Sequence, residues 1–136
     1  APLGYLGWDL CGPAALAFDY SLYALGGGLD YFHHVELPES GVVNHVLRWN
    51  GQPVRREGYF TDLVTDEAVR FIRQHAADRF FLYVAYTAPH APYQGPQDFT
   101  PQPLPRESPL QDQSRGPQAT YVAMIQRLDQ GVGQIL

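Results

Sequence analysis

The sequence feature that most constrains the fold is an apolar run from Phe80 to Tyr86, which is followed by a segment rich in proline. A run this short, with no polar residue in it, is typical of a strand buried on both faces, as found inside a parallel sheet. Pro89 and Pro92 end the run, because proline has no amide hydrogen to donate to a neighbouring strand. We therefore expect Phe80 to Tyr86 to be a central, buried strand.

His90 stands between these two prolines and is the candidate site residue. In open α/β sheets, ligands and reacting groups gather beyond the carboxyl ends of the strands. A histidine suits proton transfer at such a place, since the unperturbed imidazole titrates near neutral pH. The competing interpretation is a loop histidine whose ring is hydrogen-bonded to a backbone carbonyl.

Helical patterns on both sides of the run predict an α/β fold. The first pattern spans Thr61 to about Ala77, with Thr61 as its N-cap and Asp62 at the positive end of the helix dipole. The second spans Gln118 to Leu136, and Asp129 falls on its apolar face, where we expect a buried hydrogen-bonding group. That face comprises Val122, Ile125, Leu128, Val132 and Ile135. We expect the two helices to flank a mostly parallel central sheet.

The remaining segments predict a hairpin, a turn and a long loop. Asn50-Gly51 is a strong hairpin signal between Val42 to Trp49 and a short return strand from Val54 to Glu57. The glycines at 26–28 predict a turn with positive φ rather than a phosphate-binding loop. Gln94 to Gly116 is rich in proline and lacks an apolar period, so it predicts a long loop.

Composition excludes several classes of protein. Hydrophobic residues make up 45% of the 136 residues, which excludes a disordered chain. The net charge of −5, with acidic and basic residues interspersed, argues against a nucleic-acid-binding surface. No apolar run approaches the length of a membrane span, and the N-terminus shows no signal peptide. One cysteine cannot form an internal disulfide.

Metal ligands cannot be assigned from the sequence. His33 and His34 are adjacent, so on a strand their rings would face opposite sides and would not share a metal ion. The chain contains no paired Asp-Asp and no Asp-Asn-Gly segment. We therefore assign no residue to a metal site.

Four segments, in the same order, resemble segments of the sulfatases of the alkaline phosphatase superfamily, such as arylsulfatases and N-acetylgalactosamine-6-sulfatases. The segment Phe-Leu-Tyr-Val-Ala-Tyr-Thr-Ala-Pro-His-Ala-Pro at 81–92 is similar to the sulfatase strand that carries a histidine. The glycine-rich block Leu25 to Phe32 precedes it, and the helical patterns Gly58 to Ile72 and Tyr121 to Leu136 flank it. Together these segments cover most of the chain.

The resemblance implies an alkaline-phosphatase-like sandwich and a sulfuric ester hydrolase, whose substrates we expect to be sulfated sugars. It implies a formylglycine nucleophile and a Ca²⁺ ion on Asp and Asn ligands, all outside this chain, with Lys and His side chains that grip the sulfate. His90 matches one of those histidines. Its implied role is to hydrogen-bond the sulfate and to protonate the leaving alcohol. A periplasmic, secreted or lysosomal location is also implied.

The resemblance further implies that residues 1–136 are an internal piece of one catalytic domain, cut at both ends and inactive alone. Cys11-Gly12-Pro13-Ala14-Ala15 nearly matches the signature Cys-x-Pro-x-Arg, but Ala15 stands where Arg is required. We therefore interpret Cys11 as a small buried thiol. If Leu3-Gly4 aligns with the family block Lys-Trp-His-Leu-Gly, then Pro2 occupies the histidine position.

Two alternatives stay open at this point. One keeps the superfamily but changes the reaction to hydrolysis of phosphate or phosphonate esters, which the identity of the nucleophile would decide. The other is a non-catalytic α/β binding module that is complete at 136 residues.

Overall fold

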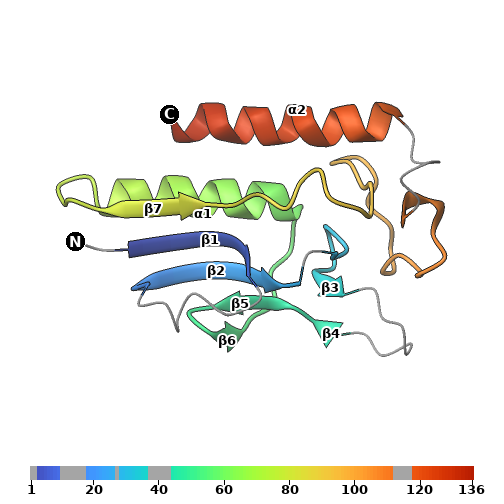
Figure 1. Cartoon of the computed structure of the whole chain (residues 1–136), viewed down its shortest axis with the longest axis horizontal. Coiled ribbons are helices and arrows are strands. Elements are labelled where there is room, and N and C mark those ends of the chain that lie inside the picture. The colour runs from blue at the N-terminus through green and yellow to red at the C-terminus, as the bar shows by residue number, and fades with distance from the viewer. Residues whose placement is uncertain (1–2, 10–17, 27, 37–43, 112–117) are drawn as a thin grey trace.

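The computed structural model describes residues 3–9, 18–26, 28–36, 44–111 and 118–136, and of residues 3–9 it describes the backbone. Cys11 and Pro2, and with them the two signature comparisons, lie outside the described residues. In Figure 1 the helix α1 (Phe60–Gln74) packs against the sheet, and the helix α2 (Gln118–Ile135) packs against α1. The expectation of an α/β fold with two helices is confirmed.

The main sheet has five strands and is mixed. Its order is β6 (Gln52–Pro53), β5 (Leu47–Trp49), β2 (Tyr20–Leu25), β1 (Leu3–Asp9) and β7 (Phe81–Val84). Strand β1 pairs in parallel with β2 and β7, whereas β5 pairs antiparallel with both β2 and β6. The expected mostly parallel central sheet is therefore not seen, because the hairpin adds as many antiparallel pairings as there are parallel ones.

The strand expected at the centre of the sheet lies at its edge. Among the described residues, β7 pairs with β1 alone, and the side chains of Phe81 and Tyr83 are 56% and 48% exposed. The expectation of a strand buried on both faces is therefore wrong for this chain. An apolar run indicates that a strand is suited to burial, but it does not indicate which other strands or helices lie beside it.

Helix α1 begins and ends close to the expected residues. Its buried side includes Phe60, Val64, Ala68 and Phe71, which recur at helical spacing and face the sheet. The expected N-cap is wrong: Tyr59 is the N-cap, without a side-chain cap, and Thr61 is buried inside the first turn.

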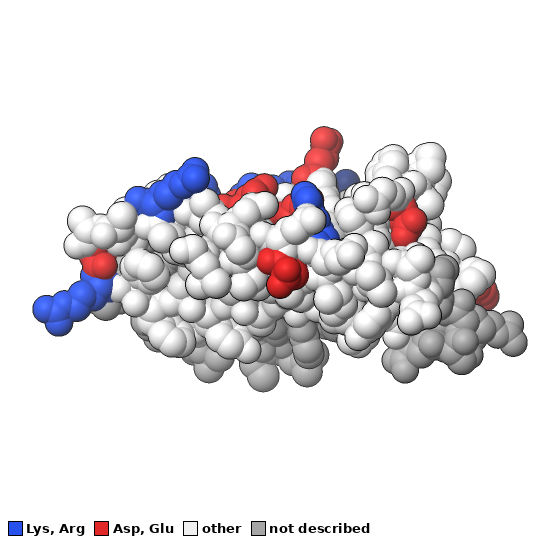
Figure 2. Space-filling model, turned by 90° about the horizontal axis from the view of Figure 1, so that it is seen from above, with Lys and Arg blue, Asp and Glu red and all other residues white. Residues whose placement is uncertain are grey.

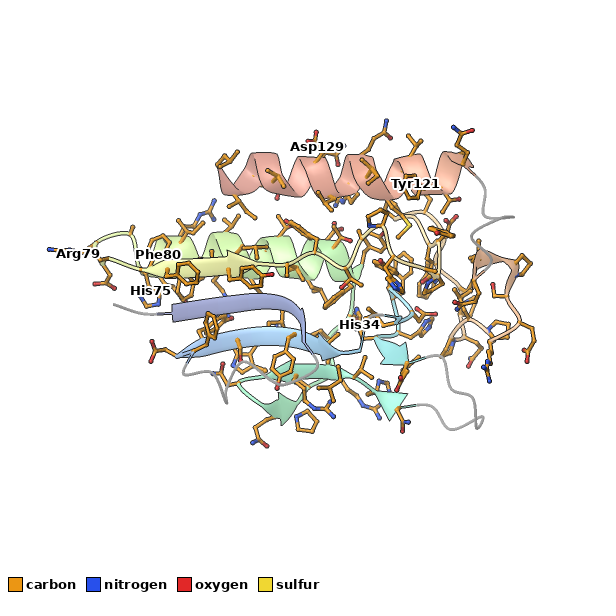
Figure 3. All side chains as sticks on the ribbon, in the orientation of Figure 1. His34, His75, Arg79, Phe80, Tyr121 and Asp129 are labelled. Atoms are coloured by element: carbon orange, nitrogen blue, oxygen red, sulfur yellow. The ribbon has the colours of Figure 1, made fainter. Side chains whose placement is uncertain are left out.

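Helix α2 has the expected bounds, and of its expected apolar face only Leu128 and Ile135 pack against the core. Met124 and Gly131 are buried, whereas Val122, Ile125 and Val132 are more than a third exposed. Asp129 is exposed, and Figure 3 shows it on the side of α2 that points away from α1, so the expectation of a buried Asp129 is wrong. The sequence pattern gave no weight to Gly131, although a Cβ there would come within 2.4 Å of Thr65 Oγ1. The absence of a side chain is what lets the two helices approach at this point.

Seen from the α2 side, the surface is mostly uncharged. Figure 2 shows acidic and basic side chains scattered over this face rather than gathered into one patch. The uncharged area includes the exposed apolar residues of α2, of which Tyr121 is 45% exposed. Among the described residues, no helix is both long enough and apolar enough to cross a membrane.

The hairpin forms where Asn50-Gly51 predicts it. Asn50 and Gly51 have φ values of 47° and 81°, the left-handed conformation that a tight hairpin turn requires at both central positions. The return strand β6 comes earlier and is shorter than the expected 54–57. A second, two-stranded sheet pairs β3 (Val35–Glu36) with β4 (Asn44–His45).

Candidate functional site

His90 follows the carboxyl end of β7, and its side chain is exposed, as expected from its place after the apolar run. The core lies directly under this loop, since Thr87 and Ala88 are buried just before it. The described part of the loop that continues from residue 94 is irregular apart from one short turn, Pro109–Gln111. The site is therefore an exposed ring on a segment whose base is buried.

Three hydrogen bonds fix His90. Its backbone N–H donates to the Thr87 carbonyl at 2.9 Å, and its own carbonyl accepts a bond of 3.0 Å from the Tyr31 hydroxyl. The ring Nδ1 lies 2.7 Å from the Ala91 carbonyl oxygen, which accepts hydrogen bonds and does not donate them. Nδ1 must therefore carry the hydrogen of this bond.

The proton on Nδ1 determines what the other ring nitrogen does. In the neutral ring Nε2 is an acceptor, and in the protonated ring it is a donor. No described residue forms a hydrogen bond with Nε2. The ring can thus exchange one proton with a bound molecule at Nε2, while its bond to the carbonyl is kept. The competing interpretation, a ring bonded to a backbone carbonyl, holds for Nδ1. It leaves Nε2 available to a ligand.

Tyr31 and Gln94 hold the loop from below. Both side chains are fully buried, and the Tyr31 N–H donates to Gln94 Oε1 at 2.8 Å. The Tyr59 hydroxyl, just before α1, donates to the Gln94 carbonyl at 2.8 Å, and its ring stacks on Tyr31 at 5.4 Å. Burial raises the pKa of both phenols, so each stays a neutral hydroxyl donor at neutral pH. Sequence reasoning missed both residues, although Tyr31 belongs to the glycine-rich block that carries the resemblance.

Two buried polar atoms of the same segment have hydrogen-bonding capacity left over. Thr87 Oγ1 and Gln94 Nε2 have no hydrogen-bond partner among the described residues. Such groups are uncommon in folded proteins, because an unpaired buried donor costs free energy. They flank His90 on both sides along the chain.

Asp30 is the buried charge that organises the neighbouring turn. Its carboxylate accepts bonds of 2.9 Å from the N–H groups of Phe32, His33 and Leu104, and it also contacts the His33 ring at 3.1 Å. Burial alone would raise the pKa of this carboxyl, but the donated hydrogen bonds outweigh burial and hold the pKa below its ordinary value. Asp30 therefore ties the turn after Tyr31 to the loop near residue 104.

The adjacent histidines have separate partners. His33 is bound to Asp30, whereas the His34 ring is buried and its Nε2 lies 3.0 Å from the Gly58 carbonyl. Burial lowers the pKa of His34, so its ring is neutral at neutral pH. In the described part of the chain, no three His, Cys, Asp or Glu side chains form a group that could hold a metal ion. A calcium ion of the kind that the resemblance implies would thus find no ligand set among these residues.

Comparisons with known proteins agree with one another on the family. The family model described as Sulfatase matches residues 11–136. An uncharacterized sulfatase, YdeN of Escherichia coli, is 34% identical over 119 residues, which are 80% of this chain and 19% of that protein. A putative extracellular sulfatase Sulf-1 homolog of Caenorhabditis elegans is 34% identical over 84 residues, 55% of this chain and 11% of that protein.

Two crystal structures are similar to nearly the whole chain. The chain is 28% identical to Ps i-CgsB, with a TM-score of 0.67 to one crystal structure and 0.66 to another, a complex with k-i-k-neocarrahexaose. The match covers 98% of this chain and 32% of that one, so the chain spans about a third of the solved structure and a smaller share of the curated relatives. The chain belongs to the sulfatase family.

Proposed function

We propose that this chain is part of a sulfuric ester hydrolase, and that His90 binds the sulfate ester and protonates the leaving alcohol. The observation that carries the proposal is the His90 ring, which is exposed, fixed through Nδ1 and left with Nε2 available. Membership of the sulfatase family supports the reaction class. The oligosaccharide in the complex of Ps i-CgsB supports a sugar as the alcohol that carries the sulfate.

The proposed step is a proton transfer. When the bond between sulfur and the alcohol oxygen breaks, the departing oxygen carries negative charge and needs a proton. A protonated His90 ring donates that proton from Nε2 and becomes neutral, while Nδ1–H stays bound to the Ala91 carbonyl. Because Tyr31 and Gln94 fix the loop, the ring needs little reorganisation before it acts.

The proposed enzyme also needs the nucleophile and the metal ion of the sulfatases that this chain resembles, but neither takes part in the proton transfer from His90. Formylglycine and Ca²⁺ would supply attack on sulfur and neutralisation of the sulfate oxygens. Among the described residues, no group of His, Cys, Asp and Glu side chains could hold that ion. We expect the 136-residue chain alone to be inactive for this reason.

The test is the hydrolysis of a galactose sulfate by the longer enzyme of which we propose this chain is a part, and by its His90→Ala variant. We expect kcat to fall about a hundred- to ten-thousand-fold, the usual contribution of a positioned acid. The melting temperature should be nearly unchanged, because the His90 side chain is exposed.

A matched control is His75→Ala. His75 is the C-cap of α1, before β7 begins, and its ring is bound to Asp78 at 3.0 Å. Its loss should leave kcat unchanged. If His90→Ala keeps full activity, or unfolds the enzyme, then His90 is a structural residue and the assignment is wrong.

A further inference from the structure

A cavity of about 650 Å³ lies beside the turn that follows Tyr31. Its walls come from segments far apart in the sequence: the turn at 32–34, the strand β4, the segment between β6 and α1, and the loop that contains Phe99. Sites for small ligands commonly have volumes of about 300–1,000 Å³. The cavity is thus large enough for one or two sugar rings, and it belongs to no site described above.

One wall of the cavity is aromatic and is held in place. Phe99 is 62% exposed, yet its ring packs edge-on against Phe32 at 5.5 Å and stacks on His33 at 5.9 Å. The Asp30 carboxylate fixes both sides of this contact, since it accepts the N–H groups of His33 and Leu104. An exposed but ordered ring of this kind offers a flat apolar surface. The C–H face of a pyranose packs well on such a surface.

The two arginines of the cavity differ in what they already bind. Arg56 is engaged, because its guanidinium lies 3.3 Å from Glu67 and 4.6 Å from the centre of the Trp49 ring. Arg55 is exposed, and in the part of the chain that the structure describes no hydrogen bond or ion pair holds its guanidinium. The planar guanidinium fits two oxygens of an oxyanion at once. Arg55 is therefore a cation available to a ligand at the rim of an aromatic cavity.

The other polar groups of the cavity are consistent with an anionic ligand. His34 is neutral and bound to Gly58, so it forms part of the wall rather than a charge. The ring of His45 also lines the cavity, and Glu57 is the acidic residue on it. Because Arg56 is paired with Glu67, Arg55 is the cation of the lining that remains for an anionic ligand.

We propose that this cavity is a second saccharide subsite, which binds an anionic sugar residue of the substrate with Arg55 on its sulfate and Phe99 on its ring. The proposal rests on the proposed function in one respect, that the substrate is a sulfated saccharide. The two sites share one rigid turn: the Tyr31 hydroxyl is bound to the His90 carbonyl, and the next residue, Phe32, is in the cavity wall. The subsite would select substrates that carry a sulfate besides the one that is cleaved.

The test is calorimetric titration of the 136-residue chain with a sulfated galactan hexasaccharide and with the same hexasaccharide after removal of its sulfates. We expect Arg55→Gln to raise the Kd for the sulfated sugar about ten- to a hundredfold, as for a lost charged hydrogen bond. Binding of the desulfated sugar should not change in this variant. Phe99→Ala should weaken the binding of both sugars. Because the Phe99 side chain is exposed, we expect this variant to fold normally.

The matched control is Arg79→Gln, which removes an exposed arginine at one end of the molecule, away from His34 (Figure 3). If Arg55→Gln weakens binding no more than Arg79→Gln does, the proposal is overturned. It is also overturned if the unaltered chain does not bind the sulfated hexasaccharide, or if Phe99→Ala binds both sugars normally while its circular dichroism shows a folded chain.

His90→Ala in the same titrations separates this proposal from the proposed function. Loss of binding in His90→Ala alone would overturn the subsite and leave the role of His90 intact. Loss in Arg55→Gln and Phe99→Ala, together with full kcat of His90→Ala in the longer enzyme, would support the subsite and refute the proposed role of His90.

Discussion

The His90 loop and the strand that leads into it differ in how much of their surroundings this chain supplies. The loop rests on buried groups of its own chain, with Tyr31 and Gln94 fully buried beneath it. Strand β7 is as apolar as the core, yet Phe81 and Tyr83 are about half exposed and one edge has no paired strand among the described residues. The comparison teaches that the His90 loop can be held in place by buried groups of this chain even though strand β7, which leads into it, is half exposed.

A pair of identical substitutions tests this difference most strongly. Phe71 is 1% exposed in the core, and Phe81 is 56% exposed on β7. Phe71→Ala should lower the free energy of unfolding by about 3–5 kcal/mol, the usual cost of emptying a buried aromatic site. Phe81→Ala should change it by no more than about 0.5 kcal/mol, as at most surface positions.

Chemical denaturation of both variants measures the two costs, and binding of a hydrophobic dye adds a second readout. We expect the unaltered chain to bind the dye through its exposed apolar residues, and Phe81→Ala to bind less of it. Equal costs for the two substitutions would show that β7 is buried in solution, and the contrast between strand and loop would be lost.

The second prediction concerns Tyr86, which joins the strand to the loop. The Tyr86 hydroxyl lies 2.7 Å from Thr65 Oγ1, and a Cβ at Gly131 would come within 2.7 Å of the same hydroxyl. Gly131→Ala should therefore destabilise the chain by about 1–3 kcal/mol, the typical cost of overpacking. Thermal unfolding measures the change.

Gly133 supplies the matched control on the same helix. A Cβ at Gly133 would meet no atom within 4 Å, so Gly133→Ala should be stabilising by about 0.8–1 kcal/mol through helix propensity alone. If both substitutions stabilise the chain, α2 does not pack on α1 and Tyr86 as described.

The third prediction concerns the charge beneath the turn. Asp30→Asn replaces one acceptor oxygen by an NH₂ group, which then faces either the N–H groups of Phe32 and His33 or that of Leu104. We expect a loss of about 1–3 kcal/mol at pH 7. Asp78→Asn, an exposed carboxylate bound to His75, should cost no more than about 0.5 kcal/mol.

The pH dependence of this loss has a definite sign. The pKa of Asp30 is lowered in the folded chain, so the carboxylate contributes stability above the unfolded pKa of about 3.9. That contribution disappears as the pH falls through the lower, folded pKa. The difference between the chain and Asp30→Asn should narrow in acid, and a difference that grows in acid would contradict the account.

Local patterns in the sequence predict much of the fold. Both helices, the Asn50-Gly51 turn and the position of His90 follow from periodicity, turn chemistry and proline, which act over a few residues. The groups that hold the site could not be predicted in this way. Tyr31 binds Gln94 and His90 across 63 and 59 residues, and Asp30 binds Leu104 across 74. No periodic pattern encodes such pairs.

The errors have a related cause. The apolar run from Phe80 to Tyr86 indicates a strand that is suited to burial. Whether that strand is central or at the edge depends on which strands lie beside it, and here β7 lies at the edge. On α2, the face was predicted only in part, because a glycine makes the closest contact there, and a glycine gives no signal in a pattern of apolar side chains.

The most direct test of the central claim, that His90 protonates the leaving alcohol, compares two leaving groups in the longer enzyme. A sugar alcohol needs a proton as it departs, whereas 4-nitrophenol leaves as a stable anion without one. We predict that His90→Ala lowers kcat about a hundred- to ten-thousand-fold for a galactose sulfate, and far less for 4-nitrophenyl sulfate. An equal loss on both substrates would contradict the claim, because it would mean that His90 binds or supports the site without donating the proton.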